Sequence, residues 1–135
     1  MAYKQNKTNK NRFIDLDMNF DMHPITKDVV RKFDAEAIKR ALKNLIFTSK
    51  YDRLFQPKIN SRIRRLLFEN VTPITASMIK SNLKDLIMQF EPRVNLINIQ
   101  VIAYPDQNAF QCTIIFRIVN QTETITLTTA LERLR

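Results

Sequence analysis

The side chains that most often perform enzyme chemistry are few and far apart in this 135-residue chain. It has one histidine, His23, and one cysteine, Cys112. His23 precedes a proline in a loop-like segment. Cys112 falls on the inward side of a predicted strand, where a free thiol behaves as a small hydrophobic residue. Because metal sites and cysteine nucleophiles need such groups clustered in one cleft, we predict neither a metal centre nor a thiol catalyst.

Paired carboxylates hydrolyse glycosidic bonds when they face each other across a cleft, about 5–9.5 Å apart. Glu36, Glu69 and Glu91 are candidates, but almost any globular protein offers as many. The chain has no glycine. This excludes phosphate loops, dinucleotide-binding turns and nucleophile elbows, because each needs backbone conformations that only glycine adopts at little cost. We therefore predict that the protein is not an enzyme and binds no cofactor.

Positive charge is concentrated in the first half of the chain. Residues 1–65 contain 16 Lys or Arg and 7 Asp or Glu, whereas residues 66–135 contain six of each, so the formal net charge of +9 belongs to the front half. Such a surplus favours an acidic partner or a nucleic acid. The polar segment 1–12 is interpreted as a flexible basic arm, and 13–135 as a single domain.

The hydropathy pattern argues against a membrane or secreted protein. No apolar run approaches the ~18 residues that span a bilayer. Residues 1–12 lack the apolar core of a secretory signal, and a single cysteine fits a reducing compartment. We therefore expect synthesis and assembly in the cytoplasm, without a membrane partner.

Three segments with apolar residues at every third or fourth position predict amphipathic helices. These segments are 35–47, 61–68 and 76–90. Their predicted N-terminal caps are Asp34, either Asn60 or Ser61, and Thr75. Pro92 is expected to end the third helix. In the loop before the second helix, Leu54 and Phe55 are expected to turn inward.

Alternating apolar and polar residues predict strands in the last third of the chain. The predicted strands are 97–104, 110–119 and 123–129, with a short further strand at 13–18. Ile97 is expected to share a face with Ile99, and 130–135 to form a frayed turn. These elements predict an α+β fold, with three helices packed on one face of a small antiparallel β-meander and a short N-terminal strand.

The last predicted strand is rich in threonine and ends the meander. Its alternating threonines are Thr124, Thr126 and Thr128. A strand in this position leaves an open sheet edge, to which another chain can add a strand. We therefore assign these three threonines to a partner-binding edge.

The segment 50–65 combines basic side chains with Tyr51 and Phe55. Its basic residues are Lys50, Arg53, Lys58, Arg62, Arg64 and Arg65. Such a patch can bind phosphates and stack on bases. No recognisable nucleic-acid-binding motif accompanies it. A basic nucleic-acid-binding module that uses this patch is therefore kept as the alternative function.

The third helix is closed by Glu91-Pro92-Arg93, which taken alone is a helix terminator with solvated charges. Together with other segments, it resembles the small baseplate wedge proteins of T4-like contractile-tailed phages, a sheath-initiator family shared with the type VI secretion baseplate protein TssE. The matching segments are 14–17, 26–29, 37–46, 53–57, 66–70, 72–73, 75–76 and 90–93. Leu67-Phe68-Glu69 and Glu91-Pro92-Arg93 are the most specific of them.

The resemblance implies a structural protein of the virion. Members of this family sit in the tail baseplate around the tail tube and seed the contractile sheath. The resemblance implies that Glu91 and Arg93 make charged contacts with the helical core bundle of the wedge, presented by Pro92. It further implies that the sheet accepts strands from sheath subunits. Expected partners are therefore other wedge proteins and tail sheath subunits, with the tail tube as a further candidate.

Three more residues complete the predicted partner-binding set: Glu69, Arg62 and Arg65. The sequence departs from the family where members usually carry glycines, after the first helix and after the Arg-x-Phe-x-Pro segment. Lys50-Tyr51-Asp52 and Lys58-Ile59-Asn60 stand at these places. We expect Asn60 to adopt the left-handed conformation that glycine would otherwise supply. The family also carries a lysozyme label, which no residue pattern in this sequence supports.

Overall fold

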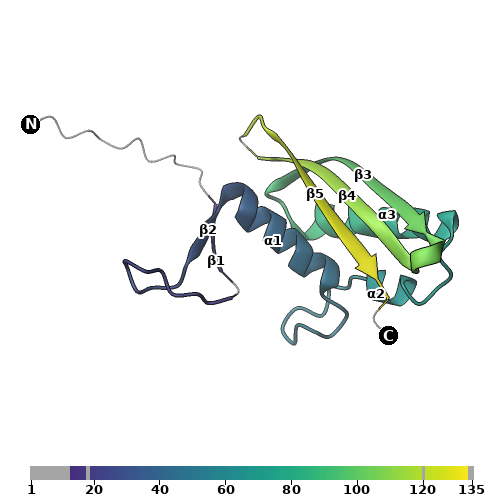
Figure 1. Cartoon of the computed structure of the whole chain (residues 1–135), viewed down its shortest axis with the longest axis horizontal. Coiled ribbons are helices and arrows are strands. Elements are labelled where there is room, and N and C mark those ends of the chain that lie inside the picture. Colours follow the sequence, from purple (N-terminus) through teal and green to yellow (C-terminus); the bar gives the residue numbers. More distant parts are fainter. Residues whose placement is uncertain (1–12, 18, 120, 134–135) are drawn as a thin grey trace, which may run out of the picture.

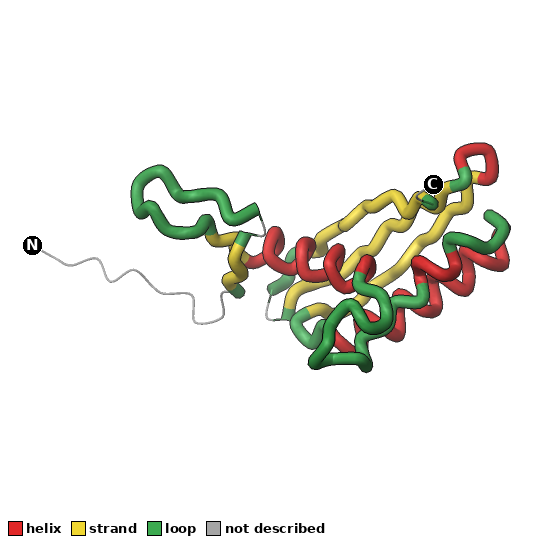
Figure 2. The backbone as a smooth tube through the Cα atoms, turned by 90° about the horizontal axis from the view of Figure 1, so that it is seen from below, coloured by secondary structure: helices red, strands yellow, loops and turns green. Residues whose placement is uncertain are grey.

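The protein is built from one layer of helices and one layer of strands (Figures 1 and 2). The computed structural model describes residues 13–133 except Met18 and Asn120, so the predicted arm at 1–12 lies outside the described residues. The helices are α1 (Asp34–Phe47), α2 (Ile63–Leu66) and α3 (Pro73–Phe90). The main sheet contains β3 (Val94–Tyr104), β4 (Ala109–Ile118) and β5 (Thr124–Glu132), antiparallel and in the order β3-β4-β5. These elements confirm the predicted α+β fold.

A second, small sheet lies beside the start of α1 (Figure 1). It pairs β1 (Ile14–Leu16) with β2 (Arg31–Phe33) in an antiparallel hairpin. The backbone N–H of Asp34 donates to Phe13 O at 2.8 Å, and Asp34 Oδ1 accepts from the N–H of Phe13 at 3.0 Å. Asp34 therefore ties the first strand to α1 and does not act as the predicted N-cap, which falls at Phe33 without a side-chain hydrogen bond.

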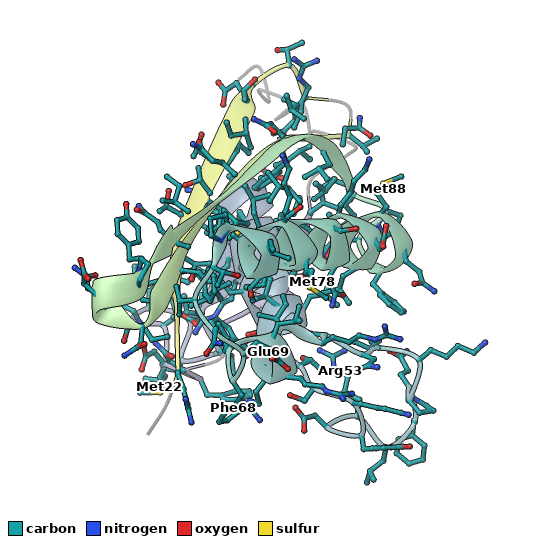
Figure 3. All side chains as sticks on the ribbon, turned by 90° about the vertical axis from the view of Figure 1, so that its right-hand side faces the viewer. Met22, Arg53, Phe68, Glu69, Met78 and Met88 are labelled. Atoms are coloured by element: carbon teal, nitrogen blue, oxygen red, sulfur yellow. The ribbon has the colours of Figure 1, made fainter. Side chains whose placement is uncertain are left out.

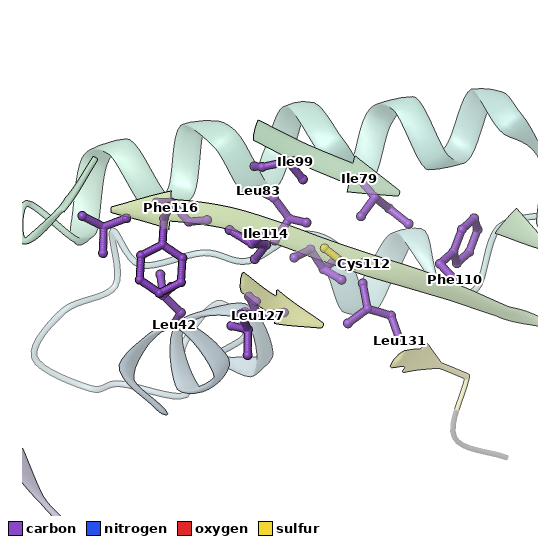
Figure 4. Packing of buried hydrophobic residues seen from close by; sticks show 14 of the residues in the cluster. Leu42, Ile79, Leu83, Ile99, Phe110, Cys112, Ile114, Phe116, Leu127 and Leu131 are labelled. Carbon is purple, nitrogen blue, oxygen red and sulfur yellow. The ribbon is translucent and has the colours of Figure 1, made fainter. Parts of the chain in front are cut away.

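The hydrophobic core fills the space between the helices and the inner face of the main sheet (Figure 4). The strand registers align the core residues in rows across the sheet, such as Ile99 with Ile114 and Leu127. Fully buried helix residues cover these rows: Ile38, Leu42, Ile46, Ile79, Leu83 and Ile87. The opposite face of the sheet carries the alternate residues of each strand and is not covered by the described helices.

A β-bulge changes the expected alternation in β3. The strand begins at Val94, and its register with β4 shifts between Leu96 and Asn98. The extra residue of a bulge moves the side chains before it to the other face. The expectation that Ile97 and Ile99 share a face was therefore wrong, because Ile97 is 52% exposed while Ile99 is 3% exposed.

The C-terminal strand is longer than the sequence pattern predicts. Residues 130–132 continue β5 instead of forming a frayed turn. Leu131 is opposite Phe110 in the register and is completely buried, which holds this end of the strand on the core. Phe110 and Leu131 thus extend the hydrophobic core to this end of the sheet (Figure 4).

Two further helix caps differ from the prediction. Thr72, and not Thr75, caps α3: its side chain accepts a hydrogen bond from the N–H of Thr75 at 3.2 Å. Pro73 then occupies the first turn, where its missing N–H costs nothing. Neither Asn60 nor Ser61 caps α2, which begins after Arg62. The predicted cap positions were thus displaced by one to three residues.

The loop between α1 and α2 is closed at its base. Ser61 Oγ donates to Ile46 O at 2.5 Å, and the N–H of Ser61 donates to Thr48 O at 3.2 Å. Tyr51 takes the positive φ of 73°, whereas Asn60 does not, so the expectation for Asn60 was wrong. Of the two places where glycine was expected from the resemblance, only the first has a residue with positive φ, and that residue is Tyr51.

The same loop also corrects the expected burial of its apolar residues. Leu54 is 87% exposed and Phe55 is 97% exposed, so neither turns inward. Ile59 takes that role: it is buried against Leu45 and Leu86. Ile59 therefore makes the apolar contact at the base of the loop that was expected of Leu54 and Phe55.

Candidate functional site

Glu91 and Arg93 form a charged clip at the C-terminal end of α3. The N–H of Glu91 completes the last helical turn by donating to Ile87 O at 2.9 Å. Arg93 Nε donates to Glu91 Oε1 at 2.6 Å, and Arg93 Nη2 donates to Oε2 at 3.1 Å. This is the side-on, two-bond geometry in which a guanidinium binds a carboxylate most strongly. Pro92 lies between them on the surface, and its ring fixes the backbone φ of the turn.

Arg93 also joins the clip to the N-terminal hairpin. Its Nη1 lies 3.4 Å from both carboxylate oxygens of Asp15, and its Cζ lies 5.6 Å from the ring centroid of Phe13. The hydrogen bond with Glu91 raises the pKa of Arg93. Burial opposes this rise, and the charges of Glu91 and Asp15 add to it. The arginine is therefore a permanent cation that links β1, α3 and β3.

The two charged groups of the clip are unequally accessible. The side chain of Glu91 is 8% exposed, and both its oxygens bind Arg93, whereas the side chain of Arg93 is 26% exposed. In the free chain, Glu91 therefore positions Arg93, and Arg93 with the exposed Pro92 forms the accessible part of the tripeptide. The role of these residues as partner contacts stays a prediction.

A shallow groove of about 600 Å³ opens beside the clip. Its wall joins residues from β1, α1 and the 49–58 loop to the clip, including Asp15, Arg40, Arg53, Phe90, Glu91 and Arg93. The contributions of Asp15 and Arg40 to this groove were not predicted, because these residues come from elements far from the tripeptide. Both lie in segments that resemble the family, 14–17 and 37–46, and this was the sequence signal for them.

A second ionic cluster fixes the hairpin against α1. Asp17 is 4% exposed, forms an ion pair with Arg40 Nη1, and has Lys32 Nζ at 3.5 Å. Burial alone would raise the pKa of Asp17. A hydrogen bond from the N–H of Asn19 and the charges of Arg40 and Lys32 outweigh that effect, so the pKa of Asp17 is below its ordinary value.

Arg62, Arg65 and Glu69 lie together in a second groove, of about 750 Å³, between α2 and α3. We call it the α2–α3 groove. Its opposite wall includes Asp85, and Phe90 lines both this groove and the clip groove. The three predicted residues are thus brought close to the clip by the packing of α2 on α3. Figure 3 shows Glu69 at the end of α2, below α3 and its exposed Met78.

The three predicted threonines lie apart from the clip, on β5. Thr124, Thr126 and Thr128 are exposed on the outer face of the sheet, opposite Arg117, Ile115 and Thr113 in the register. Within the described residues, the main chain of β5 forms hydrogen bonds on its β4 side and none on its outer side. The strand therefore presents an unpaired edge.

The basic segment 50–65 does not form one continuous surface. Arg62 and Arg65 line the α2–α3 groove, where Glu69 and Asp85 offset their charge. Arg64 lies instead in a small apolar hollow with Phe47 and Phe68. The structure thus divides the patch on which the nucleic-acid interpretation depends.

Catalytic chemistry finds little support among the described residues. No three of their His, Cys, Asp and Glu side chains lie close enough to hold a metal ion. Glu69 and Glu91 line different grooves, and Glu36 is paired with Lys39 at 3.5 Å on α1. Burial raises the pKa of the Cys112 thiol to about 12, as expected of a core residue. No described helix is both long and apolar enough to cross a membrane.

Comparisons with known proteins agree with the resemblance in the sequence. The family model described as baseplate wedge protein gp25 matches residues 33–123. The baseplate wedge protein gp25 of Enterobacteria phage T4 is 31% identical over 112 residues, which cover 83% of each chain. The region matched by the family model contains the α2–α3 groove and the clip, and it ends just before β5.

Solved structures show the same fold at lower identity. A Geobacter sulfurreducens protein, provisionally described as a tail lysozyme, has a TM-score of 0.65 at 17% identity, covering 74% of this chain and 91% of that one. A chain of the anti-feeding prophage baseplate has a TM-score of 0.62 at 16% identity, covering 92% and 88%. A chain of the pyocin R2 baseplate has a TM-score of 0.55 at 16% identity, covering 89% and 98%.

Proposed function

The chain belongs to the baseplate wedge protein gp25 family, and we propose that within a contractile tail it docks on the wedge through its clip and starts the sheath through the edge of β5. Family membership makes it a structural protein of the tail baseplate. The finer assignment divides the proposed function between two surfaces. The clip and the two grooves form the first, and the outer edge of β5 forms the second.

The open edge of β5 carries this proposal. The inner side chains Leu127 and Leu131 are 4% and 0% exposed, which anchors the strand in the core. Its outer main chain has no hydrogen-bond partner among the described residues. A rigid strand with unpaired N–H and C=O groups is a template for an incoming strand, and main-chain hydrogen bonds provide the affinity. Sheath subunits that contribute such a strand would extend this sheet.

The clip supports the docking part of the proposal. Arg93 is held by Glu91 in one orientation, and its side chain is 26% exposed and lines a groove. A preorganised arginine loses little side-chain entropy when it forms further hydrogen bonds. The C-terminus of a helix presents free carbonyl groups that attract such a cation. The wedge core bundle therefore fits this face.

The sheath-initiation role is tested with lysines on the edge strand. Thr126→Lys with Thr128→Lys places charges that discourage edge pairing without touching the core. The matched control is Asn98→Lys with Gln100→Lys, in the same rows and on the same exposed face, but on the opposite edge. We expect the β5 variant to reduce the fraction of tails with sheath at least tenfold in electron micrographs. Equal sheath formation by both variants would remove β5 from this role.

The docking role is tested with Arg93→Lys, which keeps the charge but loses the fork. Arg31→Lys is the control, because Arg31 is an exposed arginine paired with Asp28 at 3.4 Å in the hairpin. Binding to wedges isolated without this chain is measured by biolayer interferometry. We expect Arg93→Lys to bind about tenfold more weakly than the wild type. The control should bind with wild-type affinity. Unchanged binding by Arg93→Lys would place the wedge contact elsewhere.

The alternative functions lack a specific supporting observation. The basic patch is divided between two surfaces, and carboxylates in one of them offset its charge. Of the candidate carboxylates for hydrolysis, Glu69 and Glu91 line separate grooves, and Glu36 is paired with Lys39 on α1. A cell-wall clearing assay with the purified chain is the direct test of lytic activity, and a band shift at low salt is the test of nucleic-acid binding.

A further inference from the structure

The 49–58 loop exposes the two most accessible large apolar side chains of the described residues. Phe55 is 97% exposed and Leu54 is 87% exposed, next to each other at the outer end of the loop. Figure 3 shows the loop, marked by Arg53, projecting from the body of the molecule. Adjacent leucine and phenylalanine side chains in water are unfavourable, and exposed apolar patches of this kind mark interaction sites.

The loop is a structured element that holds these side chains outward. Asp52 and Ser49 bind each other twice: the N–H of Ser49 donates to Asp52 Oδ2 at 2.7 Å, and the N–H of Asp52 donates to Ser49 O at 3.2 Å. The N–H of Gln56 donates to Arg53 O at 3.2 Å, which closes a turn around Leu54 and Phe55. The apolar pair is therefore presented by a formed turn, and its entropy cost on binding is reduced.

The base of the loop is anchored in the core. Thr48 O accepts from the N–H of Ser61 at 3.2 Å, so the two ends of the loop are bridged. Ile59 is 6% exposed and packs with Leu45 and Leu86. Ile59 follows the loop directly, so its packing fixes the end of the loop against α1 and α3. This anchoring distinguishes the loop from a flexible connection.

The charges around the apolar pair are positive on the solvent side. Lys50, Arg53 and Lys58 are all exposed. The one carboxylate of the segment, Asp52, accepts a hydrogen bond from the N–H of Ser49, which uses it inside the loop. The surface that receives Leu54 and Phe55 should therefore be apolar at its centre and acidic at its rim, because opposite charges steer and align partners.

The loop is also continuous with the clip. Arg53 and Gln56 line the groove that contains Glu91 and Arg93. A partner that covers this groove must meet the loop on the same face. We infer that the 49–58 loop is a second anchor for the protein that binds the clip, inserting Leu54 and Phe55 into an apolar pocket rimmed by carboxylates on that partner. This inference rests on the proposed docking function and specifies the chemistry of the partner surface.

The test compares the loop with another exposed pair of apolar residues. Leu54→Ser with Phe55→Ser is matched by Phe20→Ser with Ile25→Ser, whose native side chains are 66% and 85% exposed in the hairpin. Affinity for wedges isolated without this chain is measured for both variants. We expect at least a tenfold loss for the loop variant, equivalent to about 1.4 kcal/mol, and less than twofold for the hairpin variant. Both should keep the wild-type melting temperature, since exposed side chains contribute little to folding.

Charge reversal tests the acidic rim. Lys50→Glu, Arg53→Glu and Lys58→Glu together should slow association and remove most of its dependence on salt. The matched control reverses three exposed lysines on α1 and α3: Lys43, Lys80 and Lys84. The inference is overturned if the loop reversal binds as tightly as the wild type, or if the control reversal weakens binding equally.

Two further measurements separate the possible outcomes. The same loop variants are tested for binding to phosphatidylserine vesicles and to a single-stranded RNA. A protein partner is rejected if binding to the vesicles or the RNA depends on Phe55 while binding to wedges does not. Arg93→Lys is measured alongside. If the Leu54 and Phe55 variant binds wedges with wild-type affinity while Arg93→Lys binds more weakly, only the loop anchor is rejected. If Arg93→Lys also binds normally, or the unmodified chain does not bind wedges, the proposed docking function fails as well.

Discussion

Replacing Glu91 with glutamine should destabilise the fold of the free chain, without any partner present. Glu91 is 6% exposed and accepts two bonds from Arg93, at 2.6 and 3.1 Å. Glutamine keeps the shape but turns an amide N–H₂ toward the guanidinium, so one charge-assisted bond is lost and the other weakened. Hydrogen bonds to charged groups contribute about 1.5–3 kcal/mol. We expect a loss of about 2 kcal/mol in the free energy of unfolding, near the middle of that range.

The neighbouring residues provide an internal scale for this loss. Arg93→Ala leaves Glu91 without its partner, which costs about 3–5 kcal/mol for a buried pair. Because Arg93 is 26% exposed, water can enter the vacated space, and we expect roughly 3 kcal/mol. Asp15→Asn should cost less than about 1 kcal/mol, since Asp15 is 39% exposed and lies 3.4 Å from Arg93. The expected order is therefore Arg93→Ala, then Glu91→Gln, then Asp15→Asn.

Urea unfolding followed by circular dichroism measures this order. For a domain of this size, 1 kcal/mol corresponds to roughly 3–5 °C in melting temperature, which gives a second measurement. The reasoning is refuted if Glu91→Gln unfolds at the wild-type urea concentration, or if Asp15→Asn is as destabilising as Glu91→Gln. Either result would mean that the clip does not hold the end of α3 in the free chain.

Three other properties follow from the structure. Cys112 should not react with a thiol reagent in the native chain at pH 8, because burial raises its pKa to about 12, and it should react once urea unfolds the protein. Tyr51→Gly should raise stability by about 0.5–1 kcal/mol, since Tyr51 has a φ of 73°, whereas Asn60→Gly should not, and urea unfolding compares them. The pKa of Asp17 is lower in the folded chain than in the unfolded chain, where it is about 3.9. Its ion pairs therefore stabilise the fold above about pH 3.9, and this stabilisation is lost as the pH falls below that value. Asp17→Asn should make the melting temperature less dependent on acid pH.

The helices and strands could be read from the sequence because their patterns are local. Ile79, Leu83 and Ile87 recur with the helical period, and each is completely buried in α3. The alternation of β4 was predicted in the same way, since its inward residues Cys112 and Phe116 are both fully buried. Patterns with a period of 3.6 or 2 report which side chains face a core, without knowledge of what the core contains.

The errors occurred where one local choice depended on a distant residue. Thr75 and Thr72 are both reasonable caps by type, and only the path of the chain into α3 selects Thr72. Ile97 follows the apolar alternation, but a bulge against β4 turns it outward. Leu54 and Phe55 look like core residues, but Ile59 already fills the cluster beneath the loop. Competition for space in a packed interior is not visible in a local pattern.

The candidate site shows the same division between local and distant information. The tripeptide Glu91-Pro92-Arg93 was identifiable because proline ends a helix and the segment resembles a family. Its partners Asp15 and Phe13 were not, since they lie 78 and 80 positions away along the chain. The amino-acid order therefore determined the secondary structure, the charged tripeptide and the threonine-rich last strand, all of which depend on near neighbours. Only the folded chain decided that Glu91 is an internal ligand of Arg93 and that the loop apolar pair is exposed, because each depends on which distant surfaces meet.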